Sequence, residues 1–272
     1  TLKNIKKTAE ILKLPALGMV PKILLNPNTG NFPFIQNRLV EIITQHIKQF
    51  FSIQNSKNPI KTMLFISTRE MEGKSVLAGN VSKKLKEEGK KVLFLNNSIL
   101  QKPIQQERKR SFLNRFLGYS DPRIAIDSSF LADPSEYLDA SEYFQYTIDE
   151  KFDKVKNYHD IIEQNGIELD CIPEYVIIEL PNLINNNYPT ELIKAADLSV
   201  LVCRSNRLWT EADQSVLDNI LPFTGSKLSF IVNGVAIKEV EALMGDLPKK
   251  GSEFRKKIKN FLTFQFFSKN QL

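Results

Sequence analysis

The stretch "FISTREMEGKSVLAGNV", Phe65–Val81, decides the fold of this chain. The residues Ile60–Ser67 at its start form a short apolar run of strand type. The residues Lys74–Glu88 that follow have the pattern of a helix, which a glycine ends. A strand that passes through a short polar loop into a helix is the local structure in which phosphate-binding loops occur. The stretch therefore predicts an α/β fold of the P-loop type.

The loop itself keeps only part of the phosphate-binding pattern G-x-x-x-x-G-K-[ST]. Gly73, Lys74 and Ser75 occupy its last three places, and Thr68 stands at the first. In a working loop the lysine reaches the β- and γ-phosphates, the hydroxyl binds Mg²⁺, and the helix directs its positive end at the anion. If the chain binds a nucleotide, we expect Thr68, Gly73, Lys74, Ser75, Val76 and Asn233 to hold it.

The interior of the loop lacks the glycines that let successive N–H groups turn toward a phosphate. Arg69, Glu70, Met71 and Glu72 fill these positions. A Cβ is unfavourable wherever the backbone needs a positive φ. Two carboxylates would repel a triphosphate unless they point away from it, and Arg69 would offset them in part. The sequence therefore leaves nucleotide binding open.

Strand-type and helical segments alternate along the rest of the chain. The further strands are expected at Lys91–Leu95, Tyr175–Leu180, Leu198–Cys203 and Leu228–Asn233. The helices are expected at Leu2–Leu14, Phe34–Phe51, Pro189–Ala195, Thr210–Leu221, Ile237–Met244 and Ser252–Phe261. Near-continuous apolar strands are typical of sheets covered on both faces. The pattern predicts a P-loop NTPase-like, three-layer α/β/α fold with a mainly parallel sheet.

The whole chain, residues 1–272, is predicted to form a single domain. Residues 1–59 would supply N-terminal helices and a proline-punctuated extended segment, Pro15–Pro27, and residues 60–272 the α/β core. Within the core, residues 104–173 diverge, and the polar-aromatic part Ser135–Asn165 predicts one or two helices outside the sheet. The chain begins at Thr1 without a methionine, which is expected of a piece of a longer protein.

Composition excludes several classes of function. The net charge of +6 is mild, and the basic clusters Arg108–Arg110 and Arg255–Lys259 lack interleaved aromatic residues, so no nucleic-acid partner is expected. No run approaches the roughly 20 apolar residues of a membrane helix. Cys171 and Cys203 lie in or beside apolar runs, which predicts buried free thiols. The two histidines have no second ligand at metal spacing.

Several motifs together resemble the cytoplasmic domain of bacterial tyrosine kinases (BY-kinases) and their polysaccharide co-polymerase relatives. The segment "LPALGMVP" is similar to the stretch that precedes that domain, and "STREMEGKSVLAGNVSKKLKEEGKKVLFL" to its Walker A loop, helix and next strand. The segment "QKP" matches an Arg-Lys-Pro of the family, "EYVIIELPNL" its Walker B strand, and "AADLSVLVCRSNRLWT" and "FIVNGV" its later strands. The resemblance covers about residues 14–235 and is poor over residues 104–173.

The departures from the family fall on its chemistry. The resemblance places Asn96 and Ser98 where the family has two aspartates that organise Mg²⁺ and activate the tyrosine hydroxyl. An amide cannot act as a general base and adds no charge to hold a metal ion. Glu179 stands at the Walker B aspartate and Leu180 at the threonine that follows. These changes imply that Asn96, Ser98 and Glu179 are degenerate positions.

Two further features of active family members are missing. The helix motif Glu-x-x-Arg-x-x-Arg, which forms subunit rings, would fall near Arg38, Glu41 and Thr44, where its pattern is not kept. The C-terminal tyrosine cluster is replaced by "NFLTFQFFSKNQL", and no tyrosine follows Tyr188. Phenylalanine has no hydroxyl that a neighbouring subunit could phosphorylate.

Three hypotheses for function follow from these observations. The first is a degenerate BY-kinase-like domain of capsule, lipopolysaccharide or exopolysaccharide export, with weak or absent nucleotide turnover. It would lie on the cytoplasmic side of the inner membrane and act through self-association, a membrane-spanning part of the same or a partner protein, and the export machinery. The second is an active kinase or ATPase that uses Mg-ATP through Lys74, Ser75 and Glu179. The third is a deviant-Walker partitioning ATPase, but its signature lysine is replaced by Arg69.

Overall fold

The structure is a computed structural model that describes residues 1–22, 32–54, 58–97, 134, 137–139, 141–236 and 239–240. The chain divides into two compact units, Thr1–Val235 and Ala236–Leu272. Almost all of the second unit, with the helices expected over residues 237–244 and 252–261, lies outside the described residues. The single domain over residues 1–272 therefore stays a prediction, and the fold below is that of the first unit.

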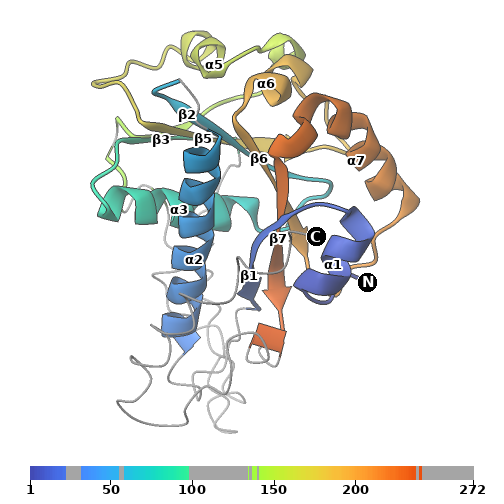
Figure 1. Ribbon diagram of the computed structural model, residues 1–272. Coiled ribbons are helices and arrows are strands. Elements are labelled where there is room, and N and C mark those ends of the chain that lie inside the picture. The colour runs from blue at the N-terminus through green and yellow to red at the C-terminus, as the bar shows by residue number, and fades with distance from the viewer. Residues whose placement is uncertain are drawn as a thin grey trace, which may run out of the picture. The chain divides into compact units, whose positions relative to one another are not determined.

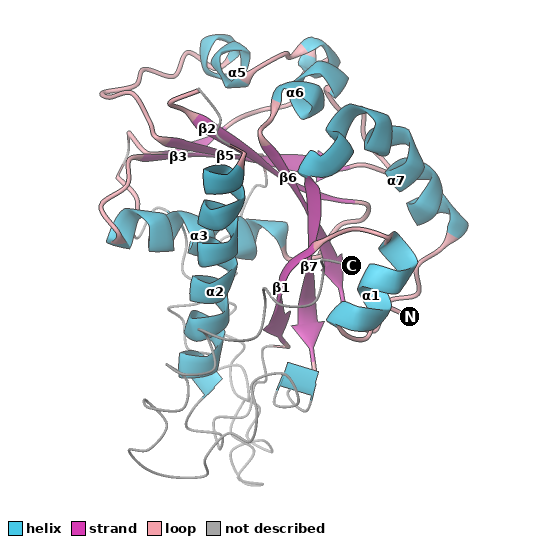
Figure 2. Cartoon of the chain, in the orientation of Figure 1, coloured by secondary structure: helices cyan, strands magenta, loops and turns pink. Residues whose placement is uncertain are grey.

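One sheet of seven strands forms the centre of the first unit (Figure 2). All neighbouring strands are parallel, in the order β1-β7-β6-β2-β5-β3-β4. The strands are β1 (Ala16–Pro21), β2 (Lys61–Ser67), β3 (Val92–Asn96), β4 (Tyr143–Gln145), β5 (Tyr175–Asn182), β6 (Leu198–Arg204) and β7 (Leu228–Val235). The predicted parallel α/β fold is confirmed.

Helices cover both faces of this sheet (Figure 1). They are α1 (Ile5–Leu12), α2 (Phe32–Ile53), α3 (Lys74–Glu87), α5 (Tyr158–Gln164), α6 (Thr190–Ala195) and α7 (Glu211–Thr224), with short 3-10 turns η3 (Phe152–Lys154) and η4 (Gly225–Lys227). α2 packs against α3 on one face, and α6 packs against α7 on the other. No helix in the described part of the chain combines the length and the hydrophobicity needed to cross a bilayer.

The central strands are buried on both faces, which explains their continuous apolar sequences. Every residue of β3 and β5 is buried, and in β2 only Lys61 is partly exposed. Alternate side chains of each strand point to opposite faces. One set, including Met63, Phe65 and Phe94, packs with α2 and α3 in the main core cluster. This core holds the carboxyl ends of β2, β3 and β5 in a fixed register beneath the loop that begins α3.

The first correction concerns the proline-punctuated segment, because part of it belongs to the sheet. The sequence predicts an extended chain over Pro15–Pro27, and residues Ala16–Pro21 form edge strand β1 parallel to β7. Leu17, Met19 and Val20 are buried there. The flanking prolines are tolerated because an edge strand needs fewer backbone donors. The pairing partner lies some 210 residues later, so no local pattern could reveal it.

The second correction concerns Ser135–Asn165, expected to be helical and outside the sheet. Residues Tyr143–Gln145 instead form β4, which extends the sheet beside β3. Aromatic residues favour strands, and the rings of Tyr143 and Phe94 lie 5.6 Å apart. The prediction is right only for the short helix α5, which Asn157 caps through its side chain. The described residues of this segment are otherwise mostly turns and irregular chain.

Candidate active site

Two side chains of the phosphate-loop motif, Lys74 and Ser75, meet Glu179 at the carboxyl ends of β2 and β5. The Ser75 hydroxyl donates a hydrogen bond of 2.8 Å to Oε1 of Glu179. The Nζ of Lys74 lies 4.0 Å from the same oxygen and donates to the Ser67 hydroxyl at 3.0 Å. Lys74 and Glu179 are both buried. The residues that would hold Mg²⁺ and the phosphates are therefore brought together, and in this structure they bind one another.

Burial raises the pKa of Glu179 to about 7, although Lys74 and the Ser75 hydroxyl lower it in part. Its second oxygen, Oε2, is buried and has no hydrogen-bond partner among the described residues. Burial also lowers the pKa of Lys74, more than Glu179 and the loop glutamates raise it. Mg²⁺ prefers carboxylate oxygens, so this carboxyl must lose its proton before it can hold the ion.

Asn96 lies beside Glu179, because the two residues are paired in register on β3 and β5. It is fully buried, and its Nδ2 donates to the Tyr143 hydroxyl at 3.3 Å. Directly after β4, the buried Tyr146 hydroxyl donates to the Glu179 carbonyl at 2.8 Å. Asn96 therefore lies level with Glu179 near the carboxyl ends of β3 and β5, where acid–base chemistry would take place. Ser98, the other residue predicted to replace a family aspartate, lies outside the described residues.

The loop glutamates make contacts within the protein. Glu72 is buried, forms an ion pair of 2.7 Å with Nε of Arg207 and accepts a hydrogen bond from the Arg204 amide. Glu70 accepts a hydrogen bond of 3.1 Å from the Asn182 side chain. Burial raises the pKa of Glu72, against the opposing effect of Arg207. The repulsion expected of Glu72 is therefore balanced by an arginine that the motif does not contain.

Arg69 does not offset the glutamates as the sequence suggests, because it pairs with Asp213. Its Nε lies 3.2 Å from the Asp213 carboxylate, and its Nη2 donates to the Thr210 hydroxyl at 2.9 Å. Thr210 and Asp213 form a capping box at the start of α7. Burial alone would raise the pKa of Asp213, but hydrogen bonds from Arg207, Thr210 and Thr68 hold it well below its ordinary value.

The backbone of the loop takes left-handed conformations at two residues. Gly73 has a φ of 91°, and Met71 has a φ of 57°. A Cβ on Gly73 would lie 2.1 Å from Nδ2 of Asn233, so only glycine fits there. Met71 keeps its side chain 83% exposed and adopts the unfavourable conformation without being a glycine. The loop thus has the expected glycine at one of its two left-handed positions.

The remaining predicted site residues lie close to the loop, but their polar groups are directed to protein partners. Asn233 donates through Nδ2 to the Glu72 carbonyl at 2.9 Å. The buried Thr68 hydroxyl donates to Asp213 at 2.7 Å and accepts from Nη2 of Arg207 at 3.0 Å. Val76 packs against the main core cluster from the first turn of α3. The structure thus brings all described candidate residues to the side of the sheet formed by the carboxyl ends of its strands.

Arg207 and Asp213 are the site residues that sequence reasoning missed. They follow the loop by more than 130 residues, and the sequence placed Asp213 only in a predicted helix and Arg207 only in a segment that resembles a family strand. The one sequence signal was the Thr-x-x-Asp pattern at Thr210, which marks a helix start. The pattern predicts the cap of α7 but says nothing about the loop that its carboxylate also binds.

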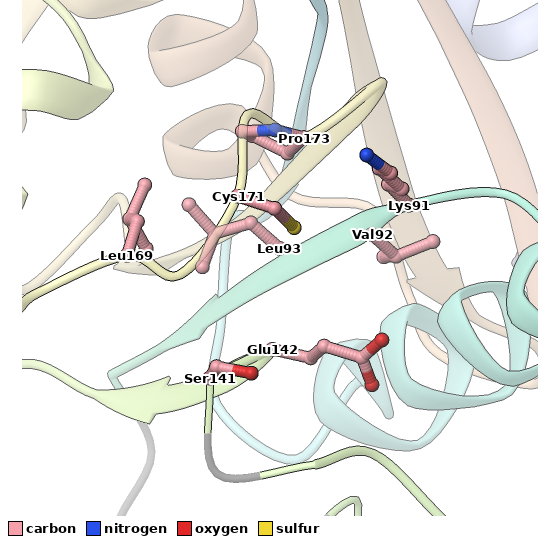
Figure 3. A pocket seen from close by; sticks show the side chains of 8 residues that line it. All are labelled: Lys91, Val92, Leu93, Ser141, Glu142, Leu169, Cys171 and Pro173. Atoms are coloured by element: carbon pink, nitrogen blue, oxygen red, sulfur yellow. The ribbon is translucent and has the colours of Figure 1, made fainter.

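The prediction that both cysteine thiols are buried is right for Cys203 and wrong for Cys171. Cys203 is buried, as expected, and burial raises the pKa of its thiol. Cys171 is exposed, because it lies in the irregular connection that leads into β5. Figure 3 shows Cys171 beside Leu93 at a pocket whose volume is about 10 Å³, enough for at most one water molecule. Within the described residues, no group of three or more His, Cys, Asp or Glu side chains could hold a metal ion.

Comparison with known proteins identifies the architecture. No family model matches the sequence, and no curated protein matches it either. Among solved structures, the chimerical protein CapA2B2 matches with a TM-score of 0.52 and 15% identity, covering 85% of this chain and 99% of its own. The kinase domain of the Escherichia coli tyrosine kinase ETK matches with a TM-score of 0.51 and 15% identity, covering 92% and 98%.

This chain has a BY-kinase-like P-loop NTPase fold. At 15% identity the similarity concerns the fold and not the activity. The similarity extends over almost the whole of both solved chains. The sequence resemblance, which rested on short motifs, is thereby confirmed at the level of architecture.

Proposed function

We propose that this chain is a degenerate BY-kinase-like domain that acts through subunit or partner contacts, with weak or absent nucleotide turnover. The observation that carries the proposal is Asn96. Its amide is fully buried and donates to the Tyr143 hydroxyl, at the level of the sheet where a carboxylate would have to remove a proton. An amide has no basic site for that proton, so the chemical step lacks its general base.

The contacts of the loop support the same proposal. The hydroxyl of Ser75 and the carboxyl of Glu179 bind each other, and the side chains of Thr68 and Glu72 are bound by Arg207. A nucleotide would have to compete with these internal partners. The raised pKa of Glu179 adds a cost, since the carboxyl must be ionised before it can hold Mg²⁺.

An active Mg-ATP-dependent kinase or ATPase is the second candidate, and a specific observation favours it. Lys74 and Ser75 are retained, Glu179 keeps a carboxyl group at the Walker B position, and the three side chains converge within hydrogen-bond or ion-pair distance. The buried, unpartnered Oε2 of Glu179 is a free acceptor for a water molecule bound to Mg²⁺. If the ion binds, Ser75 and Glu179 would hold it and Lys74 would contact the phosphates. The ion would neutralise phosphate charge, but the general base would still be missing.

The cellular role is proposed from the resemblance to BY-kinases and polysaccharide co-polymerases. In this proposal the domain lies on the cytoplasmic side of the inner membrane and is attached to a membrane-spanning part of the same or a partner protein. It would self-associate and contribute to capsule, lipopolysaccharide or exopolysaccharide export by protein contacts. This proposal does not require the chain to bind nucleic acid or to transfer phosphate.

Calorimetric titration with Mg-ATP and Mg-ADP tests the proposal. We expect no binding in the micromolar range for the wild type, and the same result for Lys74→Ala. Lys84→Ala is a suitable control, because Lys84 lies on α3 but forms surface ion pairs with Glu41 and Glu87. Micromolar binding that Lys74→Ala abolishes and Lys84→Ala retains would contradict full degeneracy and favour the second candidate.

A further inference from the structure

The Arg207 guanidinium joins the start of α7 to the two ends of the loop that precedes α3. Its Nε lies 2.7 Å from the Glu72 carboxylate, its Nη1 lies 2.8 Å from Asp213, and its Nη2 donates to the Thr68 hydroxyl at 3.0 Å. The side chain is largely buried, with 17% of its surface exposed. A planar guanidinium can donate to two acceptors in fixed directions while it pairs with a third group, which a lysine ammonium cannot reproduce. Arg207 therefore holds both ends of the loop, Thr68 and Glu72, at once.

Asp213 completes this cluster from the start of α7. Its carboxylate accepts hydrogen bonds from the side chains of Thr68, Arg69 and Thr210, in addition to Arg207. Two arginines, Arg69 and Arg207, thus face two carboxylates, Glu72 and Asp213, so the cluster is neutral as a whole. Arg69 is exposed, whereas Glu72, Asp213 and Arg207 are largely or fully buried, and breaking a buried charge pair of this kind is costly.

The segment that precedes α1 is attached to the back of the same cluster. The Leu2 amide donates to the Arg207 carbonyl at 3.1 Å, and the Asn206 amide donates to the Leu2 carbonyl at 2.7 Å. The Leu2 side chain is fully buried. Asn206, directly before Arg207, has a φ of 62°. The backbone that carries Arg207 is therefore held in a tight turn by two hydrogen bonds to Leu2.

We propose that Arg207 is a latch that couples the N-terminal segment to the phosphate-loop motif. With Leu2 in place, Arg207 is oriented to bind Thr68, Glu72 and Asp213, and the loop is held in its present conformation by protein side chains. When Leu2 is displaced, the turn at Asn206 loses its support and the loop is released. The latch works whether or not the loop binds a nucleotide, so it goes beyond the proposed function.

The rate of proteolysis at the tip of the loop measures how often the loop opens, and so tests directly whether Arg207 holds it closed. A glutamyl endopeptidase cuts after Glu70, next to the exposed Met71, but only when the loop can open locally. We expect Arg207→Lys, which keeps the charge but cannot bind three acceptors, to raise the rate of this cut at least tenfold. Cleavage is followed by mass spectrometry in the full chain. The fluorescence of Trp209, the single tryptophan, reports the same change because its ring lies 5.2 Å from the Arg207 guanidinium.

The coupling to the N-terminal segment needs a second pair of variants. Leu2→Ala is expected to raise cleavage after Glu70 and to shift Trp209 fluorescence, as Arg207→Lys does. Leu12→Ala is the matched control, because it removes the same side chain from a buried position on α1. It lowers stability without touching the Arg207 backbone. The proposal is wrong if Arg207→Lys leaves the cut unchanged, or if Leu2→Ala and Leu12→Ala raise it equally.

Discussion

The ionisation of Glu179 gives a prediction that can be worked out from the structure. Its carboxyl is buried, one oxygen has no hydrogen-bond partner, and its pKa is raised from 4.5 to about 7. The perturbation is Glu179→Gln, which keeps the shape and the acceptor for the Ser75 hydroxyl but removes the charge. We expect this variant to be more stable than the wild type at neutral and alkaline pH.

The size of the effect follows from the two pKa values. Each pKa unit corresponds to about 1.4 kcal/mol, so the full change amounts to about 3 kcal/mol in the free energy of unfolding. The folded state binds the proton more tightly than the unfolded state, so wild-type stability falls as the pH rises from 4.5 to about 7 and then levels off. This free-energy difference already includes the attraction between Lys74 and Glu179, since that attraction contributes to the pKa of Glu179.

Denaturant unfolding followed by circular dichroism, at pH values from 5 to 8, measures the difference. The wild type should lose up to about 3 kcal/mol relative to Glu179→Gln across this range. Glu174→Gln is the matched control, because Glu174 is only partly buried and its pKa is lowered, chiefly by a hydrogen bond from Lys90. Its effect should be small and of opposite sign. Parallel curves for the wild type and Glu179→Gln would refute a buried, poorly ionised carboxyl.

Three further predictions concern the loop and the thiols. Met71→Gly should raise the free energy of unfolding by roughly 0.5 to 1 kcal/mol, because an exposed residue with a φ of 57° gains from losing its Cβ. Gly73→Ala should lower the free energy of unfolding by about 2 kcal/mol or more, since the added Cβ would meet the Asn233 side chain. Chemical denaturation measures the stability of both variants, and stabilities equal to that of the wild type would contradict the loop geometry. A thiol reagent should label the exposed Cys171 rapidly and the buried Cys203 only after unfolding. Mass spectrometry after a brief treatment measures the order of labelling, and labelling of Cys203 before Cys171 would contradict the prediction.

Much of the fold could be predicted because its central strands carry local signals. The apolar runs at β2, β3, β5, β6 and β7 are buried on both faces, and the helices between them start and end near the expected residues. The two edge strands could not be predicted in the same way. β1 depends on β7 at the other end of the domain, and β4 has only three residues, so their assignment requires long-range pairing.

The candidate site could be predicted only in part, for a similar reason. Gly73, Lys74 and Ser75 follow from a contiguous motif, and Glu179 from a strand with a known resemblance. The partners of the loop glutamates could not be found, because Arg207 is 135 residues away from Glu72 and its orientation depends on a turn bound by Leu2. Sequence spacing contains no information about such contacts.

Turnover of Mg-ATP tests the central claim most directly, because the claim is that Asn96 leaves the site without a general base. Phosphate release and transfer to tyrosine should be measured at millimolar Mg-ATP for the wild type and for Lys74→Ala. The account predicts that the two proteins show the same background rate for both reactions. A wild-type rate clearly above that of Lys74→Ala, in either reaction, would contradict it.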